Sequence, residues 1–176
     1  MIPAARLPWQ SDDWRQILKS AIRDGDELLR QLDIVRTDVL APVEFGVLVP
    51  HTYLRRMERG NPADPLLRQV LATREEQINP AHFVDDPLSE RAQSPLPGLL
   101  HKYTGRALLT LTGACPIHCR YCFRRHFHYP GALDEVWRRA LDYVRADESI
   151  TEVILSGGDP LTLTDEHLQR LLEDIG

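Results

Sequence analysis

The sequence predicts an α/β protein in which an N-terminal helical region precedes the first βα units of a parallel sheet. Residues 1–98 carry helical periodicities and many prolines, whereas residues 99–176 alternate short apolar runs with helical patterns. The two apolar runs, 106–112 (RALLTLT) and 151–155 (TEVIL), are typical of strands that are buried on both faces of a parallel sheet. Each run is followed by a loop of chemically distinctive residues, at the strand end where such sheets bind ligands.

The first helix is predicted over residues 12–24. Apolar side chains recur there at helical spacing from Trp14 to Ile22, with Ser11 as a candidate N-cap and Gly25 as the expected end. A second, shorter helix is predicted over residues 26–31.

The rest of the N-terminal region mixes short elements with turns. Residues 44–49 (EFGVLV) form a candidate strand, Pro50 opens a helix that Gly60 stops, and a further helix begins near residue 65. Prolines then dominate residues 79–98, which we interpret as an ordered connector.

The C-terminal region alternates strand, helix, strand and helix. The strand at 106–112 leads into a cysteine-rich loop, a helix is predicted over 133–145, and the strand at 151–155 leads into the turn 156–160 (SGGDP). Thr164 is the expected cap of the last helix. Because the carboxyl ends of parallel strands meet at one edge of a sheet, we expect the cysteine loop and the SGGDP turn to lie close together.

Composition limits the classes of function. The formal net charge is −5, with 27% charged and 43% hydrophobic residues, which argues against a nucleic-acid binder. No apolar run approaches the length of a membrane span and the first residues lack a signal-peptide core, so we expect a cytoplasmic protein without a membrane partner. Reduced thiols are expected in that compartment.

All three cysteines of the chain, Cys115, Cys119 and Cys122, lie within eight residues. Soft sulfur ligands select zinc, copper(I) or an iron–sulfur cluster, and three of them leave one coordination position open. The alternatives are a Cys3His zinc site completed by a nearby histidine, and a disulfide with a spare thiol. The candidate histidines are His118, His126 and His128.

Two further groups of residues are candidates for ligand contacts. In the SGGDP turn the glycines allow a ligand to approach the backbone, and Asp159 can complement an ammonium group. Arg124 and Arg125 follow the last cysteine, where arginine suits bidentate recognition of a carboxylate. The segment 99–106 (LLHKYTGR), at the start of the first predicted strand, offers three potential phosphate or carboxylate donors, with a solvated basic turn as its alternative.

The spacing C-x3-C-x2-C, with Tyr121 directly before the third cysteine, resembles the signature loop of radical S-adenosylmethionine enzymes. The resemblance implies that the three cysteines bind a 4Fe-4S cluster whose fourth iron is chelated by S-adenosyl-L-methionine. It also implies that the Gly-Gly-acid turn contacts the amino group of the methionine moiety. The residues concerned are Ser156, Gly157, Gly158 and Asp159.

Four segments together resemble the lysine 2,3-aminomutase family of radical S-adenosylmethionine enzymes that also use pyridoxal 5′-phosphate: 60–70 (GNPADPLLRQV), 97–109 (PGLLHKYTGRALL), 115–127 (CPIHCRYCFRRHF) and 156–161 (SGGDPL). The resemblance implies a partial (β/α) barrel, of which this chain would hold only the start, after an N-terminal helical region with its connector. The runs HKY and FRRHF favour the branch that makes (R)-β-lysine from (S)-α-lysine for attachment to elongation factor P. Alternatives are an isomerase of free-lysine catabolism and a non-catalytic Cys3His zinc module.

The resemblance assigns roles to further residues. It implies that Arg124 binds the carboxylate of the substrate L-lysine, that an external donor supplies electrons, and that three residues lie near the pyridoxal phosphate: Lys102, Tyr103 and Arg106. The family's Schiff-base lysine lies near the carboxyl end of the full enzyme, and neither Lys19 nor Lys102 corresponds to it. We therefore expect that this chain alone does not complete the mutase reaction.

Overall fold

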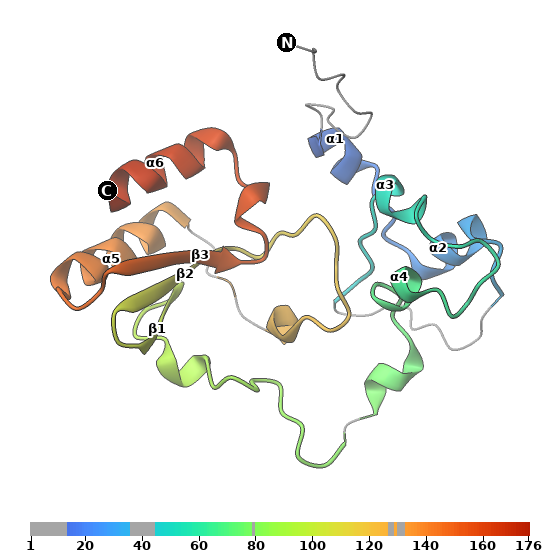
Figure 1. The fold of residues 1–176 in the computed structure, drawn as a ribbon, viewed down its shortest axis with the longest axis horizontal. Coiled ribbons are helices and arrows are strands. Elements are labelled where there is room, and N and C mark those ends of the chain that lie inside the picture. The colour runs from blue at the N-terminus through green and yellow to red at the C-terminus, as the bar shows by residue number, and fades with distance from the viewer. Residues whose placement is uncertain (1–13, 36–44, 79, 127–128, 130–132) are drawn as a thin grey trace, which may run out of the picture. The chain divides into compact units, whose positions relative to one another are not determined.

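The computed structural model describes residues 14–35, 45–78, 80–126, 129 and 133–176 (Figure 1). These residues form two compact units. The first comprises the described residues up to Pro80 together with Pro116–Cys122, and the second comprises Ala81–Cys115 and Phe123–Gly176. Each unit has its own hydrophobic core.

The first unit is built from short helices. They are α1 (Trp14–Lys19), α2 (Gly25–Gln31), α3 (His51–Leu54), α4 (Pro65–Arg68) and the 3₁₀ turn η1 (Arg74–Gln77). Their apolar faces, with the extended segment around Val49, enclose a core in which Leu28, Leu67 and Val70 are fully buried.

The predicted first helix is wrong in its second half. α1 ends at Lys19 because Ile22 forms an antiparallel bridge with Val49, with each backbone N–H donating to the partner's carbonyl at 2.9 Å. Gly25 does not end a helix but begins α2, whose N-cap is Asp24. Ser11 lies outside the described residues.

The predicted strand over 44–49 is reduced to that single bridge. Pro50 is the N-cap of α3, as the sequence predicts, but α3 stops at Leu54 and turns fill the chain as far as Gly60. Gly60 adopts the left-handed conformation (φ 73°) that suits glycine after a helical segment.

The second unit carries a three-stranded sheet in the order β1 (Leu99–Tyr103), β2 (Arg106–Thr112) and β3 (Glu152–Gly157). β2 and β3 are parallel and are connected through α5 (Leu133–Ala146), which confirms the predicted βαβ unit. α6 (Asp165–Ile175) follows, and the Thr164 side chain caps it by accepting from the His167 N–H. Short 3₁₀ turns complete the unit: η2 (Arg91–Gln93), η3 (Phe123–His126) and η4 (Pro160–Thr162).

β1 is not predicted from the sequence, which indicates phosphate or carboxylate donors over residues 99–106, with a solvated basic turn as the alternative. It pairs antiparallel with β2 through a two-residue loop in which Gly105 has a φ of 85°. A glycine with positive φ is typical of tight hairpin loops, so Thr104-Gly105 was the available signal.

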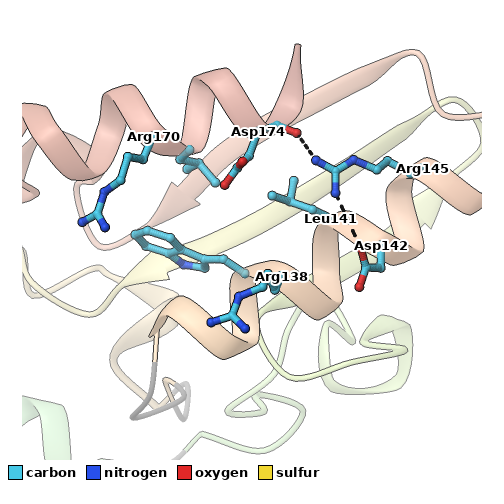
Figure 2. Close-up of a pocket in the computed structure, with 8 residues that line it drawn as sticks. Arg138, Leu141, Asp142, Arg145, Arg170 and Asp174 are labelled. Carbon is cyan, nitrogen blue, oxygen red and sulfur yellow. Dashed lines mark hydrogen bonds and ion pairs between the residues drawn. The ribbon is translucent and has the colours of Figure 1, made fainter.

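Helices cover one face of this sheet. Ala107, Leu109 and Leu111 alternate along β2 and pack with Trp137 of α5 and Leu171 of α6. A groove of about 440 Å³ remains between the two helices. Figure 2 shows its lining residues, among which Arg145 of α5 bonds to the Asp174 carbonyl of α6 and pairs with Asp142. Side chains at the intervening positions, such as Leu108, point to the opposite face.

A membrane-spanning helix is not found: within the part of the chain that the structure describes, each helix is too short or too polar to cross a bilayer.

Candidate cofactor and substrate site

The SGGDP turn follows β3 and lies against the residues that lead into the cysteine loop. The Gly158 N–H donates to the Thr112 carbonyl at 2.6 Å, and the Asp159 N–H donates to the Ala114 carbonyl at 2.8 Å. Gly157 has a φ of 120°, and a Cβ there would meet the Thr112 carbonyl oxygen at 2.5 Å. Glycine is therefore required for the close approach, and the turn lies beside the residue directly before Cys115.

Asp159 has a structural role as well as its predicted one. Its Oδ1 accepts from the Leu161 N–H at 3.0 Å and so caps η4. The other carboxylate oxygen has no hydrogen bond within the described residues, so it remains able to accept from a ligand.

None of the three cysteines forms a disulfide, so that alternative is not formed, and each of them is partly buried. Cys115 belongs to the second unit, whereas Cys119 and Cys122 belong to the first, where the Cys122 N–H donates to the Cys119 carbonyl at 3.0 Å. Among the described residues, no three histidine, cysteine or acidic side chains are gathered as metal ligands. The case for a shared metal centre therefore comes from the sequence spacing and the chemistry of the three thiols.

Backbone hydrogen bonds attach the segment 116–122 to the first unit. The His118 N–H donates to the Leu48 carbonyl at 3.1 Å, and the Arg120 N–H donates to the Gln69 carbonyl at 2.7 Å. Ile117 packs against the core of this unit. The cysteines of the segment are thus carried on a backbone that the first unit fixes.

Arg120 strengthens this attachment with a buried ion pair that the sequence analysis missed. Its Nε and Nη2 donate to the two carboxylate oxygens of Glu76 at 2.8 and 2.7 Å, and its Nη1 donates to the Phe45 carbonyl at 2.5 Å. The Arg120 side chain is only 9% exposed. A parallel fork of this kind adds geometric specificity to the charge attraction.

His118 is held through one ring nitrogen. Its Nδ1 lies 2.9 Å from the Gly46 carbonyl, and its ring stacks on Phe45 with centroids 4.5 Å apart. Because a carbonyl only accepts, Nδ1 carries the proton and Nε2 is the acceptor. A metal-binding histidine usually shows this arrangement, so the zinc alternative would use Nε2 of His118.

The other two candidate zinc ligands, His126 and His128, do not show this arrangement in the described residues. Nε2 of His126 accepts from Nε of Arg125 at 3.1 Å. His128 lies outside the described residues.

Two tyrosines surround Cys119 in the first unit. A hydrogen bond to the Cys119 side chain, followed by the charge on that thiol, raises the pKa of Tyr121. Burial, and then the charge on Cys119, raises the pKa of Tyr53. Both phenols therefore stay protonated beside the sulfur.

Arg124 lies at the start of η3 and contacts the SGGDP turn. Its Nη1 donates to Oγ of Ser156 at 2.5 Å, while Nε and Nη2 donate to the Glu90 carboxylate at 3.2 and 2.8 Å. The structure thus brings together two residues that the sequence analysis had assigned to different ligands. Glu90 was not predicted.

Lys102, Tyr103 and Arg106 line a cavity of about 220 Å³ on the sheet face opposite the helices. Its walls are mainly apolar, with a few polar groups, as is typical of small-molecule sites. Nζ of Lys102 donates to the Leu88 carbonyl at 2.9 Å, and Arg106 forms an exposed ion pair with Glu152 at 3.1 Å.

Comparisons with known proteins agree with this chemistry. A family described as a 4Fe-4S single cluster domain matches residues 104–176, the segment that contains all three cysteines and the SGGDP turn. L-lysine 2,3-aminomutase of Escherichia coli (strain K12) is 46% identical over 171 residues, which cover 93% of this chain and 50% of the relative. The protein of the same name from Haemophilus influenzae is 39% identical over 182 residues, which cover 99% and 54%.

The chain is homologous to proteins named L-lysine 2,3-aminomutase. A more distant example, from Clostridium subterminale, is 31% identical over 170 residues and covers 92% of this chain and 40% of the relative. The chain spans about half the length of the curated relatives it matches most extensively.

Proposed function

We propose that this chain contributes the cluster-binding part of a radical S-adenosylmethionine lysine 2,3-aminomutase, an isomerase that converts (S)-α-lysine to (R)-β-lysine. The observation that carries the proposal is the cysteine loop, which lies inside the segment that matches the 4Fe-4S domain and whose entry is hydrogen-bonded to the SGGDP turn. The named homologues supply the reaction class.

Cys115, Cys119 and Cys122 would hold the cluster. Three partly buried cysteines outside any disulfide are the donor set that such a cluster takes, and three ligands leave one iron for S-adenosyl-L-methionine. When bound, the cluster supplies the electron that splits this reagent, and pyridoxal 5′-phosphate, when bound, carries the substrate amine.

The SGGDP turn would seat S-adenosyl-L-methionine beside the cluster. Gly157 and Gly158 have no side chain where the turn approaches the end of β2, so the backbone is accessible to a ligand. The second carboxylate oxygen of Asp159 can accept a hydrogen bond from the ammonium group. Oγ of Ser156 accepts a hydrogen bond from Nη1 of Arg124, which links the turn to the arginine.

Arg124 would bind the carboxylate of L-lysine, and the 220 Å³ cavity would receive part of the pyridoxal phosphate. The cations of Lys102 and Arg106 suit a phosphate, and Tyr103 provides an aromatic wall. The apolar side chains of Leu100 and Leu108 exclude water from that cavity.

We further propose that the product serves the modification of elongation factor P, with an external donor reducing the cluster. The runs HKY (101–103) and FRRHF (123–127) support this branch over free-lysine catabolism. Mass spectrometry of elongation factor P from cells that lack the gene tests it. Loss of a β-lysyl modification supports the proposal, and an unchanged modification contradicts it.

The cluster itself is tested by anaerobic reconstitution. We expect a brown protein with iron and inorganic sulfide in equal amounts, and we expect Cys119→Ala to lose the colour. His118→Asn is the matched control, because it removes the zinc candidate ligand and leaves every cysteine in place. The opposite outcome is one zinc per chain and no inorganic sulfide, with the zinc lost in both Cys119→Ala and His118→Asn. That result would overturn the proposal in favour of the Cys3His zinc module.

A further inference from the structure

Glu90 lies within the proline-rich connector, yet its side chain is buried beside the candidate substrate site. The Glu90 and Arg124 side chains are 12% and 10% exposed, and their two hydrogen bonds form a fork. Glu90 lines both the 220 Å³ cavity and the small pocket around Arg124. It therefore separates the two places where we expect substrate and cofactor groups.

The position of Glu90 is itself fixed. Oδ1 of Asp86 accepts from the Glu90 N–H at 2.8 Å, and Oδ2 of Asp86 accepts from the Arg91 N–H at 3.0 Å. These two backbone hydrogen bonds lower the pKa of Asp86 and keep it ionised. The backbone that presents Glu90 is thus held by a dedicated cap.

The hydrogen bonds of Arg124 show which of its edges is available. A guanidinium has five N–H donors in a rigid fork. Glu90 takes the Nε donor and one donor of Nη2, and Ser156 takes one donor of Nη1. Within the described residues, Nη1 and Nη2 each keep one donor without a partner, and these two nitrogens border the terminal edge, which can bind a second carboxylate with two parallel hydrogen bonds.

We propose that Glu90 is a positioning residue that turns the terminal edge of Arg124 toward the carboxylate of an amino-acid substrate. The inference rests on the proposed function, which assigns that carboxylate to Arg124. Glu90 also neutralises the buried guanidinium, so the substrate carboxylate is recognised through the direction of two N–H donors more than through net charge. Without Glu90, the guanidinium is free to rotate about its side chain and the edge is no longer presented.

The test compares L-lysine with cadaverine, the same diamine without the carboxylate, in a reconstituted full-length aminomutase that contains this chain. We measure KM and kcat for lysine, the inhibition constant for cadaverine, and the melting temperature. Glu90→Gln keeps the shape of the side chain but removes the charge and one acceptor. We expect KM for lysine to rise about 10- to 100-fold, since hydrogen bonds between charged groups contribute about 1.5–3 kcal/mol. We expect a smaller change in kcat and an unchanged inhibition constant for cadaverine.

Asp142→Asn is the matched control. It makes the same kind of change at a carboxylate that is 74% exposed, pairs with Arg145 on α5 and does not line the Arg124 pocket. We expect its lysine and cadaverine constants to equal those of the parent protein. If Glu90→Gln weakens the binding of both lysine and cadaverine and also lowers the melting temperature, Glu90 has a structural role and the inference is overturned.

The outcomes separate this inference from the proposed function. If the parent enzyme binds lysine and cadaverine equally well, the role of Arg124 in the proposed function fails. If the parent discriminates and Glu90→Gln discriminates equally, Glu90 is not a positioning residue. If Glu90→Gln does not fold, Glu90→Asp is used instead. It keeps the charge, but its side chain is one methylene shorter, so the carboxylate no longer reaches both Arg124 nitrogens. An Asp variant with the parent's lysine KM would then overturn the inference.

Discussion

At the scale of single residues, one buried arginine lies within the cysteine loop and a second lies just after it, and both are held by partners that are distant in the sequence. Arg120 pairs with Glu76 and Arg124 pairs with Glu90, which lie 44 and 34 residues earlier in the chain. The sequence identified Arg124 through its neighbours, because arginine beside a metal loop suits a carboxylate. It gave no signal for either glutamate, since no local pattern marks an ion pair formed across such a separation.

Breaking the buried Arg120–Glu76 pair should lower the free energy of unfolding much more than breaking an exposed ion pair. Glu76→Gln leaves a buried guanidinium without its counter-charge, so we expect the free energy of unfolding to fall by about 3 kcal/mol. The control is Asp33→Asn, which breaks the Arg59–Asp33 pair, whose side chains are 68% and 66% exposed, and we expect a loss below about 1 kcal/mol. Urea unfolding measures both, and equal losses would show that the Arg120 pair does not anchor the loop.

At the scale of the element, α4 depends on one aspartate. Oδ1 of Asp64 accepts from the N–H groups of Leu66 and Leu67 at 2.9 Å, and Oδ2 accepts from the Glu58 N–H at 3.1 Å. The sequence predicted a helix start near residue 65 from its turn residues. It did not show that the same carboxylate also accepts a hydrogen bond from the preceding turn, because that contact depends on the fold of residues 58–64.

This cap predicts a pH-dependent stability. Burial raises the pKa of Asp64, but the three backbone hydrogen bonds outweigh it, and the pKa in the folded protein lies below its ordinary value. The ionised carboxylate therefore stabilises the fold fully above the ordinary aspartate pKa of about 3.9, and this contribution disappears as the pH falls through the lower folded value.

Replacing Asp64 tests both the size and the pH range of that contribution. Asp64→Ala should lose about 2 kcal/mol of unfolding free energy near pH 7, and its deficit relative to the parent should shrink below about pH 4. Glu148→Gln, an exposed change in a loop, should shift stability by less than about 0.5 kcal/mol at either pH. An Asp64→Ala deficit that is the same at pH 7 and pH 3 would contradict the assignment of the ionised form.

At the scale of the whole molecule, the two units differ in how far their sequences determine them. In the second unit, α5, α6, β2 and β3 have strong periodic or continuous apolar patterns, and their predicted positions agree with the structure. In the first unit, the bridge between Ile22 and Val49 overrides the helical propensity of residues 20–24. The segment 116–122 is continuous with the second unit in sequence but packs with the first, which no local pattern indicates. The division at residue 98 and the barrel remain predictions.

A last feature of the whole molecule is its scarcity of lysine: the chain has only Lys19 and Lys102 against nineteen arginines. Nζ of Lys102 donates to the Leu88 carbonyl at 2.9 Å and lies 5.7 Å from the Tyr103 ring centroid, so this cation at the cavity wall suits a phosphate. Lys19 ends α1 in the other unit. One lysine is engaged with a carbonyl and the other does not line the cavity, so neither is placed for covalent attachment of pyridoxal phosphate.

We therefore expect borohydride reduction of the chain with equimolar pyridoxal phosphate to leave no stoichiometric pyridoxyl label on Lys19 or Lys102, as measured by peptide mass spectrometry. Lys102→Gln should weaken non-covalent binding of the cofactor, followed by its absorbance in equilibrium dialysis, because it removes a cation from the cavity. Lys19→Gln is the matched control and should bind as the parent does. A stoichiometric label on Lys102 would instead make it the carrier lysine and would overturn its assignment as a phosphate contact.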